Sequence, residues 1–102
     1  MTKDVWQVEY TDTYGGEANY SWVRRATVSL APVDPDTVYT SAATVARKHR
    51  AYRRELILKA KEAIGLTGVR GRMVSYGDMY EFRPYRSCTV MFVTFDDRES
   101  GE

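Results

Sequence analysis

The side chains that could carry acid–base chemistry are few and widely spaced. Asp12 and Glu17 flank one glycine turn, while Asp78 and Glu81 lie at a second. If the two turns lie side by side, these four carboxylates could meet and act as an acid and a base with separated pKa values. Carboxylates in such positions more often cap turns or pair with arginine, and we expect that structural role here.

Nucleophilic and metal chemistry have even less support. Cys88 is the only cysteine and His49 the only histidine. A nucleophilic cysteine needs a base, and nothing in the sequence brings these two side chains together. His49 falls within an apolar helical stripe and Cys88 opens an apolar strand, so we expect both to be core residues. No spacing resembles a zinc site. The sequence therefore predicts a protein that is not an enzyme, with no bound metal and no cofactor.

Length and charge restrict the remaining classes of function. A chain of 102 residues with a formal charge of +1 is typical of one domain, here spanning residues 1–102. This charge balance argues against a wholly basic nucleic-acid coat. A single cysteine allows no disulfide within the chain, which favours a reducing compartment. The N-terminus lacks the apolar stretch of a signal peptide, and the longest apolar run, residues 90–93, is too short to span a bilayer. We expect a cytoplasmic protein with no membrane partner.

Hydrophobic alternation predicts the elements that must position these residues. Strands are expected at residues 5–10, 19–30, 72–76, 79–83 and 87–95, with a wide hairpin around Gly15 and Gly16. The last strand is the most apolar and is expected to be central. A linker at 34–40 leads into one long helix, and residues 96–102 are expected to be a disordered tail. The fold class is α+β: two layers, an antiparallel sheet of four or five strands with one helix on one face, in the order β-β-α-β-β-β.

The helix is expected to begin after Asp36 or Ser41 and to end at Gly65. Its apolar stripe comprises Val38, Ala42, Val45, His49, Tyr52, Leu56, Ala60 and Ala63. From 41 to 64 it would be about 36 Å long, whereas a seven-residue strand spans about 23 Å. The helix therefore overhangs the sheet, and either a second subunit covers its end, as in a homodimer, or the helix kinks or unravels there.

Two surfaces are candidates for binding. The first hairpin carries Tyr14, Glu17, Tyr20 and Trp22, residue types that suit an interface. The back of the helix carries a basic ridge beside Leu58, and Arg50, Arg54 and Leu58 are expected to form a second patch for a protein partner. An alternative is nucleic-acid binding by the ridge and by an aromatic and arginine-rich sheet face around Tyr76, Tyr80, Phe82 and Tyr85. The basic residues assigned to that alternative are Arg47, Arg50, Arg54, Lys61, Arg83 and Arg86.

Several strings resemble a family of short open reading frames that are common in bacteriophage and prophage genomes. They are residues 10–25, then 65–68, 77–79 and 83–85, and the resemblance covers two thirds of the chain. The middle is shorter in that family, so the basic helix around 37–54 looks like an elaboration. No established activity is attached to the family. The resemblance implies a phage accessory protein that acts inside a bacterial host cell.

These observations favour a small non-catalytic accessory protein that engages a host macromolecule, foremost a host protein. Nucleic-acid binding is the alternative. A second alternative is the binding of a nucleotide-like small molecule in an aromatic pocket rimmed by arginine and carboxylate.

Overall fold

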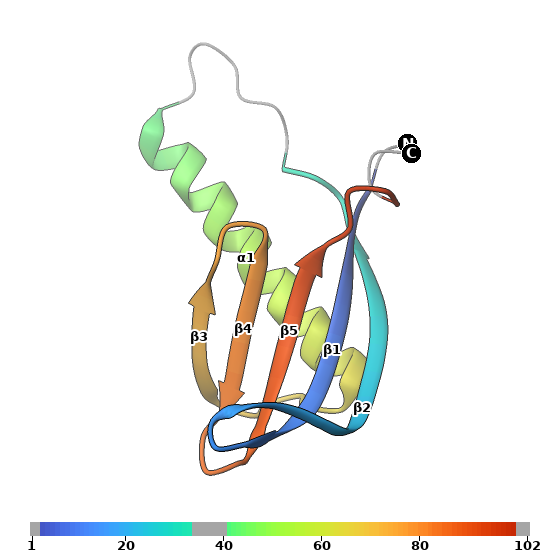
Figure 1. Ribbon diagram of the computed structural model, residues 1–102. Helices are drawn as coiled ribbons and strands as arrows, with labels where there is room; N and C mark the ends of the chain where they lie inside the picture. The colour runs from blue at the N-terminus through green and yellow to red at the C-terminus, as the bar shows by residue number, and fades with distance from the viewer. Residues whose placement is uncertain (1–2, 34–40, 100–102) are drawn as a thin grey trace.

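The computed structural model describes residues 3–33 and 41–99, which form one five-stranded antiparallel sheet with one helix packed on it (Figure 1). The elements in chain order are β1 (Asp4–Tyr14), β2 (Glu17–Leu30), α1 (Ala42–Ile64), β3 (Gly71–Ser75), β4 (Met79–Pro84) and β5 (Thr89–Phe95). The strand order is β2-β1-β5-β4-β3. The expected α+β fold, its element order and the central position of the last strand are confirmed.

The first hairpin is longer and tighter than expected. Tyr14 pairs with Glu17, so only Gly15 and Gly16 form the turn, with φ angles of 62° and 87°. Two consecutive glycines tolerate positive φ, which is what a two-residue turn matched to the strand twist requires. The prediction of a wide hairpin was therefore wrong, because the two strands continue up to the glycines.

The end of this hairpin bends across the sheet. The β1–β2 register shifts between Thr11 and Thr13, and Tyr20 has a left-handed φ of 55°. Figure 1 shows the turn curling over the lower end of the sheet on the side opposite α1. Thr11 and Val90 pair at this end of the sheet. Their side chains point away from α1, because the residues beside them in the two strands belong to the face under α1. Both are nevertheless fully buried. The face away from the helix is thus covered at this end.

Helix α1 has well-defined ends. The Ser41 hydroxyl accepts a hydrogen bond from the Thr44 N–H at 3.2 Å, which makes Ser41 the N-cap. Gly65 ends the helix in the left-handed conformation, with a φ of 84°, as expected. Of the two N-caps considered, Asp36 lies outside the described residues, as do Val38 and the whole linker at 34–40.

The core lies between the C-terminal half of α1 and the sheet. Four helix residues, Leu56, Ile57, Ala60 and Ile64, are buried. The strand residues that bury them are Trp6, Val8, Tyr10, Val28, Leu30, Phe82, Met91 and Val93. At about 1.5–3 kcal/mol for each large apolar side chain, this contact is the main attachment of the helix.

The N-terminal half of α1 extends beyond the sheet, as expected (Figure 1). None of residues 42–50 is buried. The prediction that His49 is a core residue was wrong: His49 is exposed, because it lines an open depression between α1 and the strand residues Trp6 and Tyr80 instead of packing against them. At the other end Ala63 is also exposed, and Ile57 and Ile64 extend the buried stripe instead.

Two expectations near the C-terminus also need correction. Cys88 is exposed, because β5 begins only at Thr89 and Cys88 lies in the preceding turn. Residues 96–99 form a turn rather than a frayed tail: the Asp96 N–H donates to the Val5 carbonyl at 2.9 Å, and the Gln7 amide donates to the Asp96 carboxylate at 2.8 Å. Residues 100–102 lie outside the described chain.

The pairing of β3 with β4 leaves no space for a side chain at Gly71. A Cβ atom on Gly71 would lie 2.3 Å from the Arg83 carbonyl oxygen and 2.7 Å from the Phe82 ring. We expect Gly71→Ala to lower the free energy of unfolding by about 1–3 kcal/mol, since backbone must move to relieve the clash. Urea denaturation measures this loss.

A contrast is available at Gly16, where a Cβ atom would meet nothing within 4 Å and only the positive φ penalises a side chain. Gly16→Ala should therefore cost about 1 kcal/mol. A smaller loss for Gly71→Ala than for Gly16→Ala would contradict the packing described for β3 and β4.

Candidate binding surfaces

The four carboxylates considered for acid–base work do not converge. The Phe95 N–H donates to the Asp78 carbonyl, which places Asp78 at the end of β5, whereas Asp12 pairs with Thr89 at its start. The two turns therefore lie at opposite ends of the sheet (Figure 1). Glu81 forms an ion pair with Arg83 at 2.8 Å. The acid–base arrangement considered from the sequence is absent from the described residues.

Asp12 instead holds the end of the first hairpin together. Its carboxylate accepts hydrogen bonds from the Ser21 hydroxyl, from the Asn19 amide at 2.9 Å, from the Ser21 N–H at 2.9 Å and from the Thr11 hydroxyl. These hydrogen bonds hold the pKa of Asp12 well below its usual range, and the bond from the Ser21 hydroxyl has the largest effect, ahead of that from Asn19. A carboxylate occupied in this way fixes the loop and is a poor proton acceptor.

The Tyr20 side chain lies across the face of the hairpin that points away from α1. Its hydroxyl donates to the Glu9 carboxylate at 2.7 Å, and Glu9 also pairs with Arg25 at 3.1 Å. The hydrogen bond to Glu9 raises the pKa of Tyr20. The Tyr20 side chain remains accessible, since the residue is 49 % exposed.

Trp22 lies on the other face, beside the core. Its ring meets the Tyr10 ring edge-on, with centroids 5.2 Å apart. The Arg24 guanidinium lies 5.8 Å from the same Tyr10 ring and donates to the Ile64 carbonyl at 2.6 Å. Arg24 therefore faces the same side of the sheet as the core. Trp22 is 42 % exposed and closes one end of the core.

The hairpin aromatics are accessible, yet they do not form one surface. Glu9 and Tyr10 are neighbours in β1, so the partners of Tyr20 and Trp22 lie on opposite faces. The left-handed φ of Tyr20 interrupts the alternation that would place residues 20 and 22 on the same side. Tyr14, at 82 % exposure, and the exposed Glu17 lie beside the turn. A partner therefore meets either face of the hairpin, or its turn, separately.

Part of the basic ridge of the helix, Arg50, Arg54 and Lys61, lines a groove that the sequence did not predict. We use the term α1 groove for the depression of about 330 Å³ between α1 and the edge strand β3. It is lined by Arg50, Arg53, Arg54, Ile57, Leu58, Lys61 and Met73. Arg47 is not part of it and donates to the Thr44 hydroxyl at 3.4 Å. The sequence did not single out Arg53 or Met73, and Met73 could not be found because its strand is distant in the chain.

The cations of the α1 groove have no carboxylate partner in the described chain. The ion pairs among residues 3–33 and 41–99 are Arg25–Glu9, Lys59–Glu55 and Arg83–Glu81. Helix α1 carries seven Lys or Arg residues and two Glu residues, within a chain whose formal charge is only +1. Positive charge is thus concentrated on the helix and is left available beside the groove.

The sheet residues assigned to nucleic-acid binding do not line this groove. Phe82 is buried under α1, so its neighbour Arg83 points to the other face, where it pairs with Glu81. Arg86 lies in the turn after β4 with a φ of 60°. Tyr80 packs on Trp6 at the helix side, with ring centroids 5.7 Å apart. The expected aromatic and arginine-rich face is therefore divided between the two sides of the sheet.

Two further features concern metals and membranes. Within the described chain, no three His, Cys, Asp or Glu side chains gather as metal ligands would. In that same part of the chain, no helix is both long enough and apolar enough to traverse a bilayer.

The chain matches no family model, no curated protein and no solved structure.

The hydrogen bonds to Asp12 generate a pH-dependent prediction. Because the folded-state pKa of Asp12 is depressed, its stabilising effect is complete above the pKa of the unfolded chain and is lost as the pH falls. We expect Asp12→Asn to lower Tm at neutral pH, and we expect the gap from wild type to narrow below about pH 4. Thermal melts from neutral to acidic pH measure this gap.

Asp97→Asn is the matched control, because Asp97 is exposed and outside the hairpin. It should leave the pH profile unchanged. If Asp12→Asn melts with wild type at every pH, the four hydrogen bonds do not hold the hairpin.

Proposed function

We propose that this protein is a non-catalytic binding module that engages an acidic segment of another protein through the α1 groove. The observation that carries the proposal is the mixture of charge and exposed apolar surface in one groove. Leu58 is 59 % exposed and Met73 is 38 % exposed, and both lie among cations without carboxylate partners in the described chain. Exposed apolar side chains at such a position favour a ligand with an apolar face of its own.

An acidic amphipathic segment matches this combination. Its carboxylates would pair with Arg50, Arg53 and Arg54, while its apolar side chains would cover Leu58 and Met73. From Arg50 to Lys61 the groove follows the helix for about 16 Å, at 1.5 Å per residue. That length accommodates about three turns of a partner helix. Complementary charge would speed the encounter, and the apolar contacts would prolong it.

The first hairpin supplies a second contact in this proposal. Tyr14 and Glu17 at the turn are accessible, and the hydrogen bonds of Asp12 and Glu9 hold the loop in one conformation before binding. A loop ordered in advance loses less entropy on association. If the resemblance to phage proteins holds, the partner is a protein of the bacterial host.

Pull-down from a bacterial lysate with charge-reversed variants tests the role of the groove. We expect Arg50→Glu combined with Arg54→Glu to lose the partner retained by wild type, since two attractive contacts become repulsive. Leu58→Ala should weaken the same complex about tenfold, a typical effect for an apolar contact at the centre of an interface. Nuclease treatment should change nothing.

Lys48→Glu is the matched control. It reverses a charge on the same helix, but Lys48 lies beside Ala51 and Glu55, away from the α1 groove. Retention of the same partner by all four proteins would contradict the proposal.

Nucleic-acid binding is the second candidate, favoured by the seven Lys or Arg residues against two Glu on α1. It predicts that nuclease releases the bound material. It also predicts an affinity for an oligonucleotide that falls steeply between about 50 and 200 mM salt. Fluorescence anisotropy at the two salt concentrations separates this candidate from a protein partner.

A further inference from the structure

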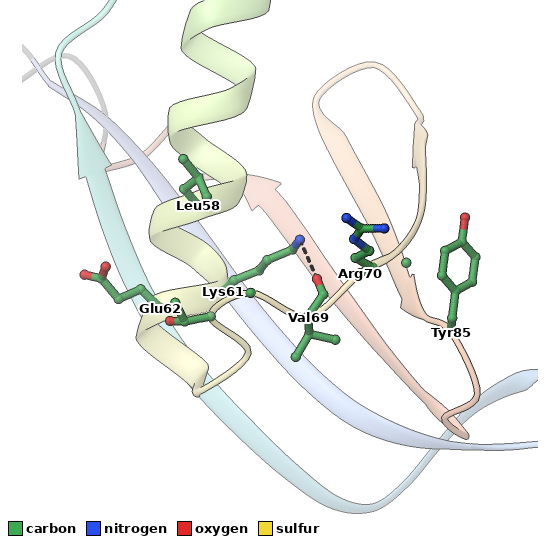
Figure 2. Close-up of a pocket in the computed structure, with 9 residues that line it drawn as sticks. Leu58, Lys61, Glu62, Val69, Arg70 and Tyr85 are labelled. Atoms are coloured by element: carbon green, nitrogen blue, oxygen red, sulfur yellow. Dashed lines mark hydrogen bonds between the residues drawn. The ribbon is translucent and has the colours of Figure 1, made fainter.

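A second cavity adjoins the α1 groove at the C-terminal end of the helix. We use the term Lys61 cavity for this space of about 630 Å³ between α1, the loop that follows it and the start of the turn after β4 (Figure 2). Its lining comprises Leu58, Lys61, Glu62, Thr67, Gly68, Val69, Arg70, Gly71 and Tyr85. The α1 groove shares only Leu58 and Lys61 with it.

Lys61 is held in place with no counter-charge among residues 3–33 and 41–99. Its Nζ donates to the Val69 carbonyl at 2.8 Å and lies 4.2 Å from the centroid of the Phe82 ring. Burial lowers the pKa of Lys61. A partly buried ammonium without an anionic partner is unfavourable, and a bound anion would remove that cost. With one N–H on Val69, the ammonium has donors left for the cavity.

Arg70 adds a second cation to the same cavity. It has no carboxylate partner within residues 3–33 and 41–99. Its backbone is fixed, because the Arg70 carbonyl accepts from the Tyr85 N–H at 3.1 Å and the preceding Val69 N–H donates to the Leu66 carbonyl at 3.0 Å. Figure 2 shows that the Glu62 and Lys61 side chains extend in opposite directions from α1. Glu62, the acidic residue of the lining, therefore does not neutralise the Lys61 ammonium.

We propose that the Lys61 cavity binds the oxyanion of a small ligand, a phosphoryl or carboxylate group held between the Lys61 ammonium and the Arg70 guanidinium. The guanidinium provides the fork of donors that such groups accept, and the ammonium adds a compact charge. The accessible Tyr85 ring, 64 % exposed, offers a wall for the rest of the ligand. This inference goes beyond the protein-binding proposal, because it concerns a small anion and depends on Arg70, which lies outside the α1 groove.

Thermal melts with inorganic phosphate or acetate in place of chloride, at constant ionic strength, test the site. We expect at least one of the two anions to raise Tm, by roughly 5–10 °C at ten times its Kd. A rise with phosphate alone identifies a phosphoryl site, and a rise with acetate alone identifies a carboxylate site. In either case, amide NMR shifts of unmodified protein should be largest at Thr67, Val69 and Arg70.

Lys61→Met and Arg70→Gln should each abolish the rise, whereas Arg72→Gln, which removes a cation from the other face of the sheet, should retain it. Arg70→Gln leaves the α1 groove intact, so its effect is separable from loss of a protein partner. The proposal is overturned if neither anion raises Tm, or if the rise is the same in all three variants. It is also overturned if the NMR shifts are largest elsewhere on the protein.

Discussion

The packing of the last three turns of α1 onto β2 and β1 is the contact on which the rest of the structure depends. Leu56, Ala60 and Ile64 are almost completely buried there. The Arg24 guanidinium secures the end of the helix by donating to the Ile64 carbonyl. Further toward the N-terminus, the Tyr52 hydroxyl donates to Asp4 at 2.6 Å and accepts from the Trp6 ring N–H at 2.9 Å. No helix residue on the N-terminal side of Tyr52 is buried.

This one-sided attachment explains where the candidate surfaces lie. The helix crosses the sheet obliquely, with its C-terminal end at β2 and its N-terminal end beyond the sheet (Figure 1). A groove remains between α1 and β3, because the helix does not cover that edge. The long basic side chains at Arg50, Arg53 and Arg54 line this groove, since the opposite side of the helix is committed to the core. The oblique packing of α1 therefore both attaches the helix to the sheet and leaves its basic side chains accessible.

The sequence predicted the features that depend on local patterns. Alternating strands, the glycine that ends the helix and the row of cations opposite the apolar stripe follow from periods of two and of about 3.6 residues. It did not predict features set by a single backbone angle or by a distant segment. One left-handed residue, Tyr20, separates the hairpin aromatics, and His49 belongs to the apolar stripe but is exposed, because an open depression separates α1 from the sheet there. Arg70 and Lys61 share a cavity only because the loop after α1 folds back along the helix.

Amide hydrogen exchange along α1 in the free protein tests most directly whether the helix is held by one half and available at the other. We expect the amides of residues 56–64 to exchange only through global unfolding. Those of residues 46–50 should exchange at least about tenfold faster, at a rate unchanged by dilution of the protein. Equal protection along the whole helix would contradict the account, because it would mean that the basic half of α1 is already covered.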